Sequence, residues 1–210
     1  MSRKSSRPRC PVCGLHQELC LCAGLPVRDL SSDFVVVQHN RERNKPTSTG
    51  RVTAAVLRAP LLNYGAQGEV FDARELQRPD TDYYVLYPLE GAAVVDDPST
   101  RPAPGRRRCF VILDGTWHQC SRMARRAPGV EAMPHLALPA GPPSRWGVRT
   151  PPNPAAVCTF EAAARLVEVL HGAEAAAPMT AFFTELSARM LGQRGRVVLR
   201  DEPDAALADD

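Results

Sequence analysis

Continuous apolar runs alternate with amphipathic segments along this chain. Such runs are typical of parallel strands covered on both faces, because neither face of the strand meets water. They predict strands over residues 33–39, 83–87, 109–113 and 135–138, and a shorter strand over residues 69–71. The segments between them predict helices over residues 51–59, 117–126 and 178–191, and a further helix that begins at Thr159. This alternation predicts an α/β sandwich.

The helix that begins at Thr159 has the clearest amphipathic spacing. Its apolar residues fall on one helical face at intervals of three and four. They are Phe160, Ala163, Ala164, Val167 and Leu170. Before this helix, residues 141–154 are rich in proline and glycine and have no regular period. Long irregular connections inside compact domains usually carry function, whereas the Pro- and Asp-rich residues 96–104 predict an ordinary loop.

Asp114-Gly115-Thr116-Trp117 directly follow the strand predicted over residues 109–113. A carboxylate in this position stands at the carboxyl end of a strand, where open α/β sheets bind ligands. Gly115 permits a close backbone approach, Thr116 can cap the next helix, and Trp117 offers a flat surface to a ligand. The same four residues also fit a helix cap followed by a core tryptophan. Taken alone, the tetrapeptide leaves both interpretations open.

Four cysteines lie within thirteen residues near the start of the chain, at Cys10, Cys13, Cys20 and Cys22. Two close pairs separated by a short loop can supply four thiolates to one tetrahedral Zn²⁺. A redox pair and cysteines with no shared role are the competing interpretations. Four protein ligands leave no open position, so zinc here would be structural or would serve RNA binding. The remaining cysteines, Cys109, Cys120 and Cys158, are expected to be small buried side chains.

The charge is unevenly distributed. The 210 residues carry a net charge of +3, but the last ten hold five acids and no base, so the first 200 carry +8. The bases form clusters, and clusters of this kind attract phosphate backbones. They are Arg3, Lys4, Arg7 and Arg9; Arg41, Arg43 and Lys45; Arg101, Arg106, Arg107 and Arg108; and Arg122, Arg125 and Arg126. Together they predict a nucleic-acid partner, although each cluster alone also fits solvated surface.

We expect four parts along the chain: a flexible basic arm over residues 1–9, a zinc knuckle over 10–26, a main domain over 27–195 and an acidic tail over 196–210. No apolar segment follows the arm, and no run reaches the roughly 18 apolar residues that span a bilayer. We therefore expect a cytoplasmic protein that does not enter a membrane. No Gly-x-Gly-x-x-Gly motif follows a strand and there is no Walker loop, so a nucleotide site of either kind is unsupported.

From Cys10 to Leu191 the chain resembles the DTW-domain family, the tRNA-uridine aminocarboxypropyltransferases. The resemblance rests on five motifs in the family's order. They are Cys10-x-x-Cys13 with Cys20-x-Cys22; Lys45-Pro46-Thr47-Ser48-Thr49-Gly50-Arg51; Tyr87-Pro88; Leu113-Asp114-Gly115-Thr116-Trp117; and Arg149 followed by Cys158-Thr159-x-Glu161. Two positions depart from the family pattern. Ser48 stands where the family often has Asn, and Trp146 stands where a Tyr is usual.

The resemblance implies a SPOUT-like α/β knot sandwich in which residues 27–195 form the catalytic domain and residues 141–154 fit the knot cover. It implies transfer of the 3-amino-3-carboxypropyl group of S-adenosylmethionine to N3 of a tRNA uridine. The products are 3-(3-amino-3-carboxypropyl)uridine and methylthioadenosine. A SPOUT-type RNA methyltransferase using the same co-substrate and a non-catalytic zinc-knuckle RNA-binding protein are the alternatives. The oligomeric state and the modified uridine are not predicted.

The resemblance also implies roles for single residues. Catalysis falls to Asp114, Thr116 and Trp117, and S-adenosylmethionine binding to Tyr87, Pro88, Asp114, Gly115, Arg149, Cys158, Thr159 and Glu161. The tRNA contacts are Arg41, Arg43, Lys45, Thr49, Arg106, Arg107 and Arg108. Asp114 is the first candidate for the base that accepts the uridine proton, or it could hold the co-substrate's amino group. His39 and Glu42 are further base candidates, and Arg149 could pair with the co-substrate carboxylate or with a phosphate.

Overall fold

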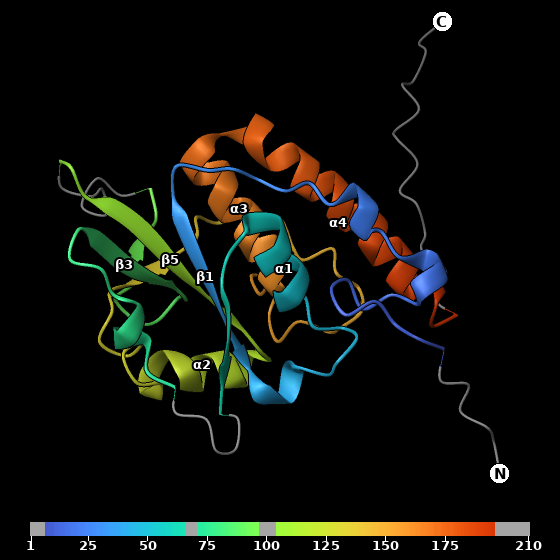
Figure 1. The fold of residues 1–210 in the computed structure, drawn as a ribbon, viewed down its shortest axis with the longest axis horizontal. Coiled ribbons are helices and arrows are strands. Elements are labelled where there is room, and N and C mark those ends of the chain that lie inside the picture. Colours follow the sequence, from blue (N-terminus) through green and yellow to red (C-terminus); the bar gives the residue numbers. More distant parts are fainter. Residues whose placement is uncertain (1–6, 66–70, 97–103, 196–210) are drawn as a thin grey trace, which may run out of the picture.

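Six parallel strands form one sheet in the order β2-β1-β5-β3-β6-β4 (Figure 1). The computed structural model describes residues 7–65, 71–96 and 104–195. The strands are β1 (Asp33–His39), β2 (Leu61–Tyr64), β3 (Thr81–Leu86), β4 (Ala93–Val94), β5 (Arg107–Asp114) and β6 (His135–Ala137). Each pair of neighbours is parallel. All six carboxyl ends therefore lie along one edge of the sheet.

Helices cover both faces of this sheet. They are α1 (Gly50–Leu57), α2 (Trp117–Arg126), α3 (Thr159–His171) and α4 (Ala173–Gly192). Figure 1 shows α2 on one face and the other three helices on the opposite face. Successive strand side chains alternate between the faces, so Phe110 and Ile112 pack with α1, α3 and α4, while Val111 and Leu113 pack on the α2 side. The same alternation turns the side chain of Asp114 towards α1 and α3.

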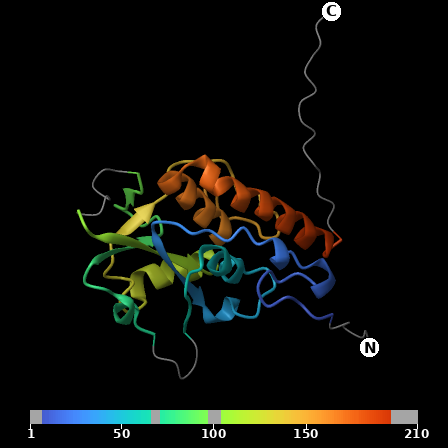
Figure 2. The same ribbon diagram turned by 45° about the horizontal axis from the view of Figure 1, so that its top comes forward.

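The cysteine-rich segment, residues 10–26, packs into the same core as α3 and α4. Leu15 is fully buried in that core, and Cys10 and Cys13 are buried beside it. The backbone N–H of His16 donates to the Gln193 side chain over 2.8 Å, and the Arg189 side chain donates to the carbonyl of Leu19 over 3.1 Å. Figures 1 and 2 both show this segment beside the far end of α4. The first and last described parts of the chain are thus neighbours.

Most of the predicted elements are confirmed, including the central strands β1 and β5 and the apolar face of α3. The structure corrects the start of α4, which begins at Ala173, so that Pro178 lies inside the helix instead of opening it. Strands β2 and β4 were not predicted. Phe71 lies outside any strand, and the rest of the short strand predicted over residues 69–71 lies outside the described residues. Residues 141–154 contain no helix or strand, as expected for a functional loop.

Three other expectations fall wholly or partly on residues that the structure does not describe. These are the basic arm, of which residues 1–6 are not described; the loop over 96–104, of which 97–103 are not described; and the acidic tail over 196–210. Within the described ranges, none of the helices combines the length with the apolar character that crossing a bilayer requires.

Candidate functional site

A cavity of about 640 Å³ opens at the carboxyl edge of the sheet. Its walls are the residues that follow β3, β5 and β6, together with residues 138–141 and 149–159 and the segment that enters α1. Ten residues of the predicted sites line it: Thr49, Tyr87, Pro88, Asp114, Gly115, Thr116, Trp117, Arg149, Cys158 and Thr159. Its volume is typical of sites for small molecules and cofactors, and its place at the strand ends is the usual one in open α/β sheets.

Asp114 joins three separate parts of this cavity. Its Oδ2 accepts hydrogen bonds from Gln38 Nε2 at 2.8 Å and from Ser48 Oγ at 2.7 Å. Its Oδ1 accepts one from Thr159 Oγ1 at 2.7 Å. The side chain is buried, with 3% exposure. A carboxylate offers about four lone-pair positions, so three internal bonds leave room for one more partner.

Gly50 is a glycine because the Asp114 carboxylate packs against it. A Cβ at Gly50 would lie 2.4 Å from Cγ and 2.5 Å from Oδ2 of Asp114. Gly50 is the first residue of α1 and Thr159 is the first residue of α3, so the carboxylate lies at the N-termini of both helices. The N-terminus of a helix carries partial positive charge, which favours an anionic group at this position.

Arg149 is engaged by a buried carboxylate. Its Nη2 donates to Glu42 Oε2 at 2.5 Å and to Thr47 Oγ1 at 2.9 Å, and its Nε donates to Thr47 at 3.2 Å. Glu42 also accepts a bond from Lys45 Nζ at 2.6 Å, and its side chain is only 1% exposed. Among the described residues, Nη1 of Arg149 has no partner. One edge of the guanidinium therefore remains available in the cavity.

Glu161 fastens the irregular segment over the cavity to α3. Its carboxylate accepts bonds from Ser144 Oγ at 2.5 Å, from the backbone N–H of Arg145 at 2.6 Å and from that of Cys158 at 3.0 Å. Glu161 was expected to contact S-adenosylmethionine, but it does not line the cavity, and its oxygens are used within the protein. Its contribution to the site is to hold residues 144–145 in place.

Tyr87 and Trp117 form an aromatic pair in the cavity wall, with ring centroids 5.7 Å apart. Both side chains are half-buried, so Trp117 is not a core tryptophan, and its ring lies beside the cavity. Thr116 caps α2 as the sequence predicted, because it accepts from the N–H of Gln119 and its own N–H donates to that side chain. The helix-cap interpretation and the ligand-site interpretation of the tetrapeptide are therefore compatible.

Two other predicted residues, Thr49 and Cys158, form part of the cavity wall. Thr49 is buried, and its hydroxyl accepts from the N–H of Phe160, which links α1 to α3. Cys158 precedes α3, is half-buried in the cavity wall and packs against the core, so the expectation of a buried cysteine holds in part. Burial raises the pKa of the Cys158 thiol well above its usual value, so the thiol stays protonated. Cys109 and Cys120 are buried as expected.

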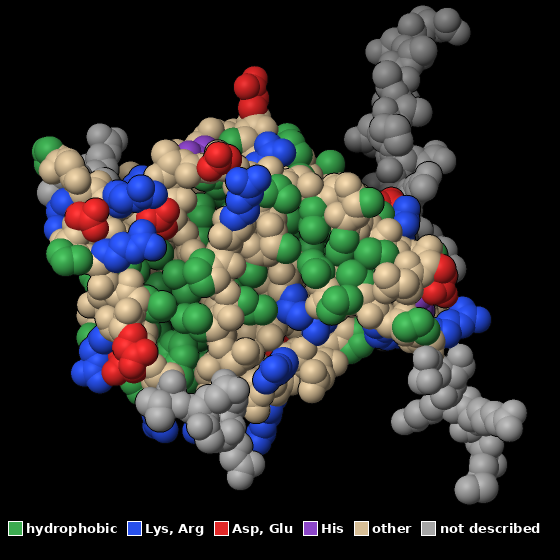
Figure 3. Space-filling view, in the orientation of Figure 1, with side chains coloured by type: hydrophobic (Ala, Val, Ile, Leu, Met, Phe, Trp, Pro, Cys, Tyr) green, Lys and Arg blue, Asp and Glu red, His purple; other side chains and the backbone are tan. Residues whose placement is uncertain are grey.

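The predicted tRNA contacts lie at opposite edges of the sheet. Arg41, Arg43 and Lys45 follow the carboxyl end of β1, on the edge where the cavity opens, and all three are exposed. Residues 106–108 stand at the amino end of β5, on the other edge. Figure 3 shows basic and acidic side chains interleaved over that amino edge, at its upper left. The two basic groups cannot contact the same point of a ligand.

The four knuckle cysteines converge as metal ligands would. Their Sγ atoms all lie within 4.8 Å of one another, with Cys10 and Cys22 at 3.5 Å and Cys13 and Cys20 at 3.8 Å. Zn–S bonds of about 2.3 Å in a tetrahedron put sulfur atoms ~3.8 Å apart, so the geometry fits one zinc ion. Burial opposes ionisation of Cys10, but the N–H groups of Cys13 and Val12 and the neighbouring thiols lower its pKa to about 7, whereas burial raises the pKa values of Cys13 and Cys22. This cluster could therefore bind a metal.

Sequence reasoning missed three residues of the site. Gln38 is fully buried and donates to both Ser48 and Asp114. Thr47 holds the Arg149 guanidinium, and His118 lines the cavity next to Trp117. A signal was available for two of them, because Thr47 lies in the Lys45-to-Arg51 motif and His118 follows the tetrapeptide. His39 and Glu42, the further base candidates, do not line the cavity.

The parallel sheet and the cavity at its carboxyl edge define an open α/β protein, a class in which ligands usually bind at the strand ends. Within that class the chain belongs to the DTW domain family, whose model matches residues 7–191.

Two relatives carry the same name, tRNA-uridine aminocarboxypropyltransferase 2. The one from Mus musculus is 25% identical over 170 residues, which cover 78% of this chain and 57% of the mouse protein. The one from Drosophila melanogaster is 26% identical over 174 residues, which cover 78% of this chain and 67% of the fly protein. The chain thus matches little more than half the length of the mouse relative. No solved structure matches the chain.

Proposed function

We propose that this chain transfers the 3-amino-3-carboxypropyl group of S-adenosylmethionine to N3 of a tRNA uridine. The single observation that carries the proposal is the meeting of three family motifs at one carboxylate. Asp114 from the tetrapeptide accepts bonds from Ser48 of the Lys45-to-Arg51 motif and from Thr159 of the last motif, in the wall of a cavity of about 640 Å³. The activity named for the mouse and fly relatives supports it.

In this proposal the residues of the cavity act mainly by positioning two substrates. The bond between sulfur and the γ-carbon breaks while N3 bonds to that carbon, and methylthioadenosine leaves with the electron pair. The unpartnered Nη1 of Arg149 offers donors to the co-substrate carboxylate. The half-buried rings of Tyr87 and Trp117 offer a stacking surface to adenine or to the uridine.

Asp114 is the carboxylate of the cavity, since no other acid among the described residues lines it. Its three internal bonds favour an anchoring role, in which it holds the ends of β1 and β5 and the starts of α1 and α3 together. One lone-pair position remains for the N3 proton or for the amino group of the co-substrate. His118, which also lines the cavity, is the second proton acceptor there.

The remaining expectations belong to the same proposal. Arg41, Arg43 and Lys45 would contact tRNA phosphates beside the cavity, since they are exposed on its edge of the sheet. A Zn²⁺ ion held by Cys10, Cys13, Cys20 and Cys22 would be structural, because four thiolates complete its shell. The SPOUT relationship, the knot and the cytoplasmic location remain predictions from the sequence.

The test follows the fate of labelled carbon. The purified chain is incubated with tRNA and S-adenosylmethionine labelled in either the carboxyl or the methyl carbon. We expect the carboxyl label in tRNA and the methyl label in methylthioadenosine. Methyl label in tRNA would instead identify a methyltransferase, and tRNA binding with neither label would identify a binding protein.

Variants assign the transfer to the cavity. Asp114→Asn should abolish transfer, because an amide presents an N–H to donors that need an acceptor. Asp72→Asn removes a half-buried carboxylate that lies outside the cavity and serves as the control, with transfer retained. Full transfer by Asp114→Asn would exclude the proposed role of this carboxylate.

A further inference from the structure

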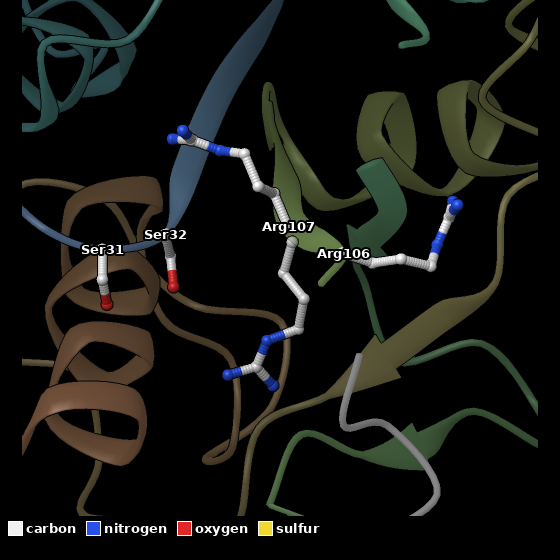
Figure 4. A pocket seen from close by; sticks show the side chains of 5 residues that line it. Ser31, Ser32, Arg106 and Arg107 are labelled. Carbon is white, nitrogen blue, oxygen red and sulfur yellow. The ribbon is translucent and has the colours of Figure 1, made fainter. Parts of the chain in front are cut away.

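A second recess, of about 450 Å³, lies at the amino end of β5 and is lined by Ser31, Ser32, Arg106, Arg107 and Arg108. Figure 4 shows Ser31 and Ser32 on the segment that enters β1, beside Arg106 and Arg107 at the start of β5. The seven residue steps from Arg107 to Asp114 span ~23 Å along the strand. The recess is therefore separate from the cavity that holds Asp114, and no part of the proposed reaction uses it.

Two of the three arginines are fixed by neighbouring acids without losing all their donors. Arg107 pairs with Asp33 through Nε at 3.0 Å and Nη2 at 2.7 Å, which leaves Nη1. Arg106 pairs with Asp82 through Nε at 2.7 Å and donates from Nη1 to the carbonyl of Pro79 at 2.8 Å, which leaves Nη2. Arg106 pairs with Asp82, the register partner of Arg108, whereas Arg107 leaves the strand on the opposite face with Asp33. The donor that a ligand beside Arg108 would meet already oriented is therefore Nη2 of Arg106.

Arg108 differs from these two arginines. Its guanidinium carbon lies 5.5 Å from the centroid of the Phe110 ring, a cation–π contact. Among the described residues it has no carboxylate partner within ion-pair distance. Among the described residues, Arg106 and Arg108 face the one paired carboxylate of Asp82, so this side of the recess keeps one positive charge. Nearby Arg78 and Asp80 add one charge of each sign.

We propose that this recess binds a phosphate group of the tRNA backbone at a distance from the reacting uridine. Guanidinium N–H groups and serine hydroxyls are the donors that phosphate oxygens accept. Among the described residues, no aromatic ring on which a base could stack lines the recess. The inference rests on the proposed function, because it takes tRNA as the substrate. With this site, the protein would contact tRNA at both edges of the sheet, through Arg41–Lys45 at one edge and Arg106–Arg108 at the other.

The test measures tRNA binding without S-adenosylmethionine, so that its outcome does not depend on the transfer reaction. Arg108→Gln removes the unpaired cation, and Ser31→Asp adds a negative charge at an exposed position of the recess. Each should weaken binding by about 5-fold at physiological salt. Arg108→Gln should also make the plot of log affinity against log salt shallower by about 0.7–0.9, the loss of one phosphate contact. Thermal melts establish that both variants are folded.

Arg74→Gln is the matched control, because it removes one positive charge from an exposed arginine outside the recess. Binding by this control should equal that of the unaltered protein. Equal losses in Arg74→Gln and Arg108→Gln would mean a diffuse charge effect and would overturn the proposal. So would unchanged tRNA binding in Arg108→Gln and Ser31→Asp.

Inorganic phosphate serves as a separate probe, because a free anion could use the same donors. Suppose that phosphate binds to the unaltered protein but not to Arg108→Gln, while both proteins bind tRNA equally well. The recess would then bind a free anion, and the proposed tRNA contact would be wrong. Failure of the carbon-label experiment, by contrast, would refute the transfer reaction and leave the binding result standing.

Discussion

Removal of Arg149 should destabilise the protein more than removal of its partner Glu42. The two side chains form one ion pair, but substitution of either one leaves a different charged partner without its counter-charge. Glu42 is 1% exposed in its side chain, whereas Arg149 is 31% exposed. A buried charge that loses its partner costs about 3–5 kcal/mol, because it stays desolvated. An exposed cation can turn to water instead.

The structure sets the sizes of the two effects. In Arg149→Met, the Glu42 carboxylate keeps only Lys45, whose side chain is 46% exposed, so we expect a loss of about 2–4 kcal/mol. In Glu42→Gln, the amide oxygen can still accept from Arg149 and the guanidinium can hydrate, so we expect about 1 kcal/mol. The double variant should be less destabilised than the sum, because no buried charge remains.

Urea unfolding of the three variants and the unaltered protein gives these free energies. Arg107→Met is the matched control, since its partner Asp33 is 31% exposed and the pair should contribute at most about 1 kcal/mol. A larger loss in Glu42→Gln than in Arg149→Met, or additive losses in the double variant, would refute the reasoning from burial.

Three further predictions concern single features. Gly50→Ala should lower the free energy of unfolding by about 1–3 kcal/mol, because the new Cβ would meet Asp114. Gly24→Ala is the control, since a Cβ at Gly24 has nothing within 4 Å. Equal urea midpoints for the two variants would contradict this. Purified protein should contain one zinc per chain, and a chelator should lower its Tm, because Leu15 lies in the shared core; folded protein free of metal would contradict it. Burial lowers the pKa of His39, His135 and His171, so the unfolded chain binds more protons, and Tm should fall as the pH drops below about 6.5; an unchanged Tm at pH 5.5 would count against this.

The interior of the sheet could be predicted from sequence because its strands are buried on both faces. β1 and β5 each contain a short continuous apolar run rich in β-branched residues, which favours a buried strand over a helix. β2 and β4 are the two edges of the sheet, and they are short and half-buried or exposed, so they carry no such run. A continuous apolar pattern indicates a strand that is buried on both faces, and these edge strands are not.

The site was predictable as a set of motifs, but not as a set of contacts. Nothing in the spacing joins Glu42 to Arg149, which lie 107 positions apart in the chain. Those two residues meet only because β1 and the segment before α3 end at the same edge. The separation of Arg106–Arg108 from the cavity, by contrast, was available from the sequence. That run precedes a strand which Asp114 ends, so the two had to lie at opposite edges.

The packing of the knuckle against α4 has a consequence for synthesis. His16 donates to Gln193, 177 positions later, and a Cβ at Gly14 would meet the carbonyl of Pro46 at 2.2 Å. At roughly 5–20 residues per second, the ribosome delivers Gln193 about 10–35 s after His16. The knuckle can therefore form early, against Pro46, but its hydrogen bond to α4 can form only after Gln193 has been synthesised. A segment made early is thus held in part by one made 177 residues later.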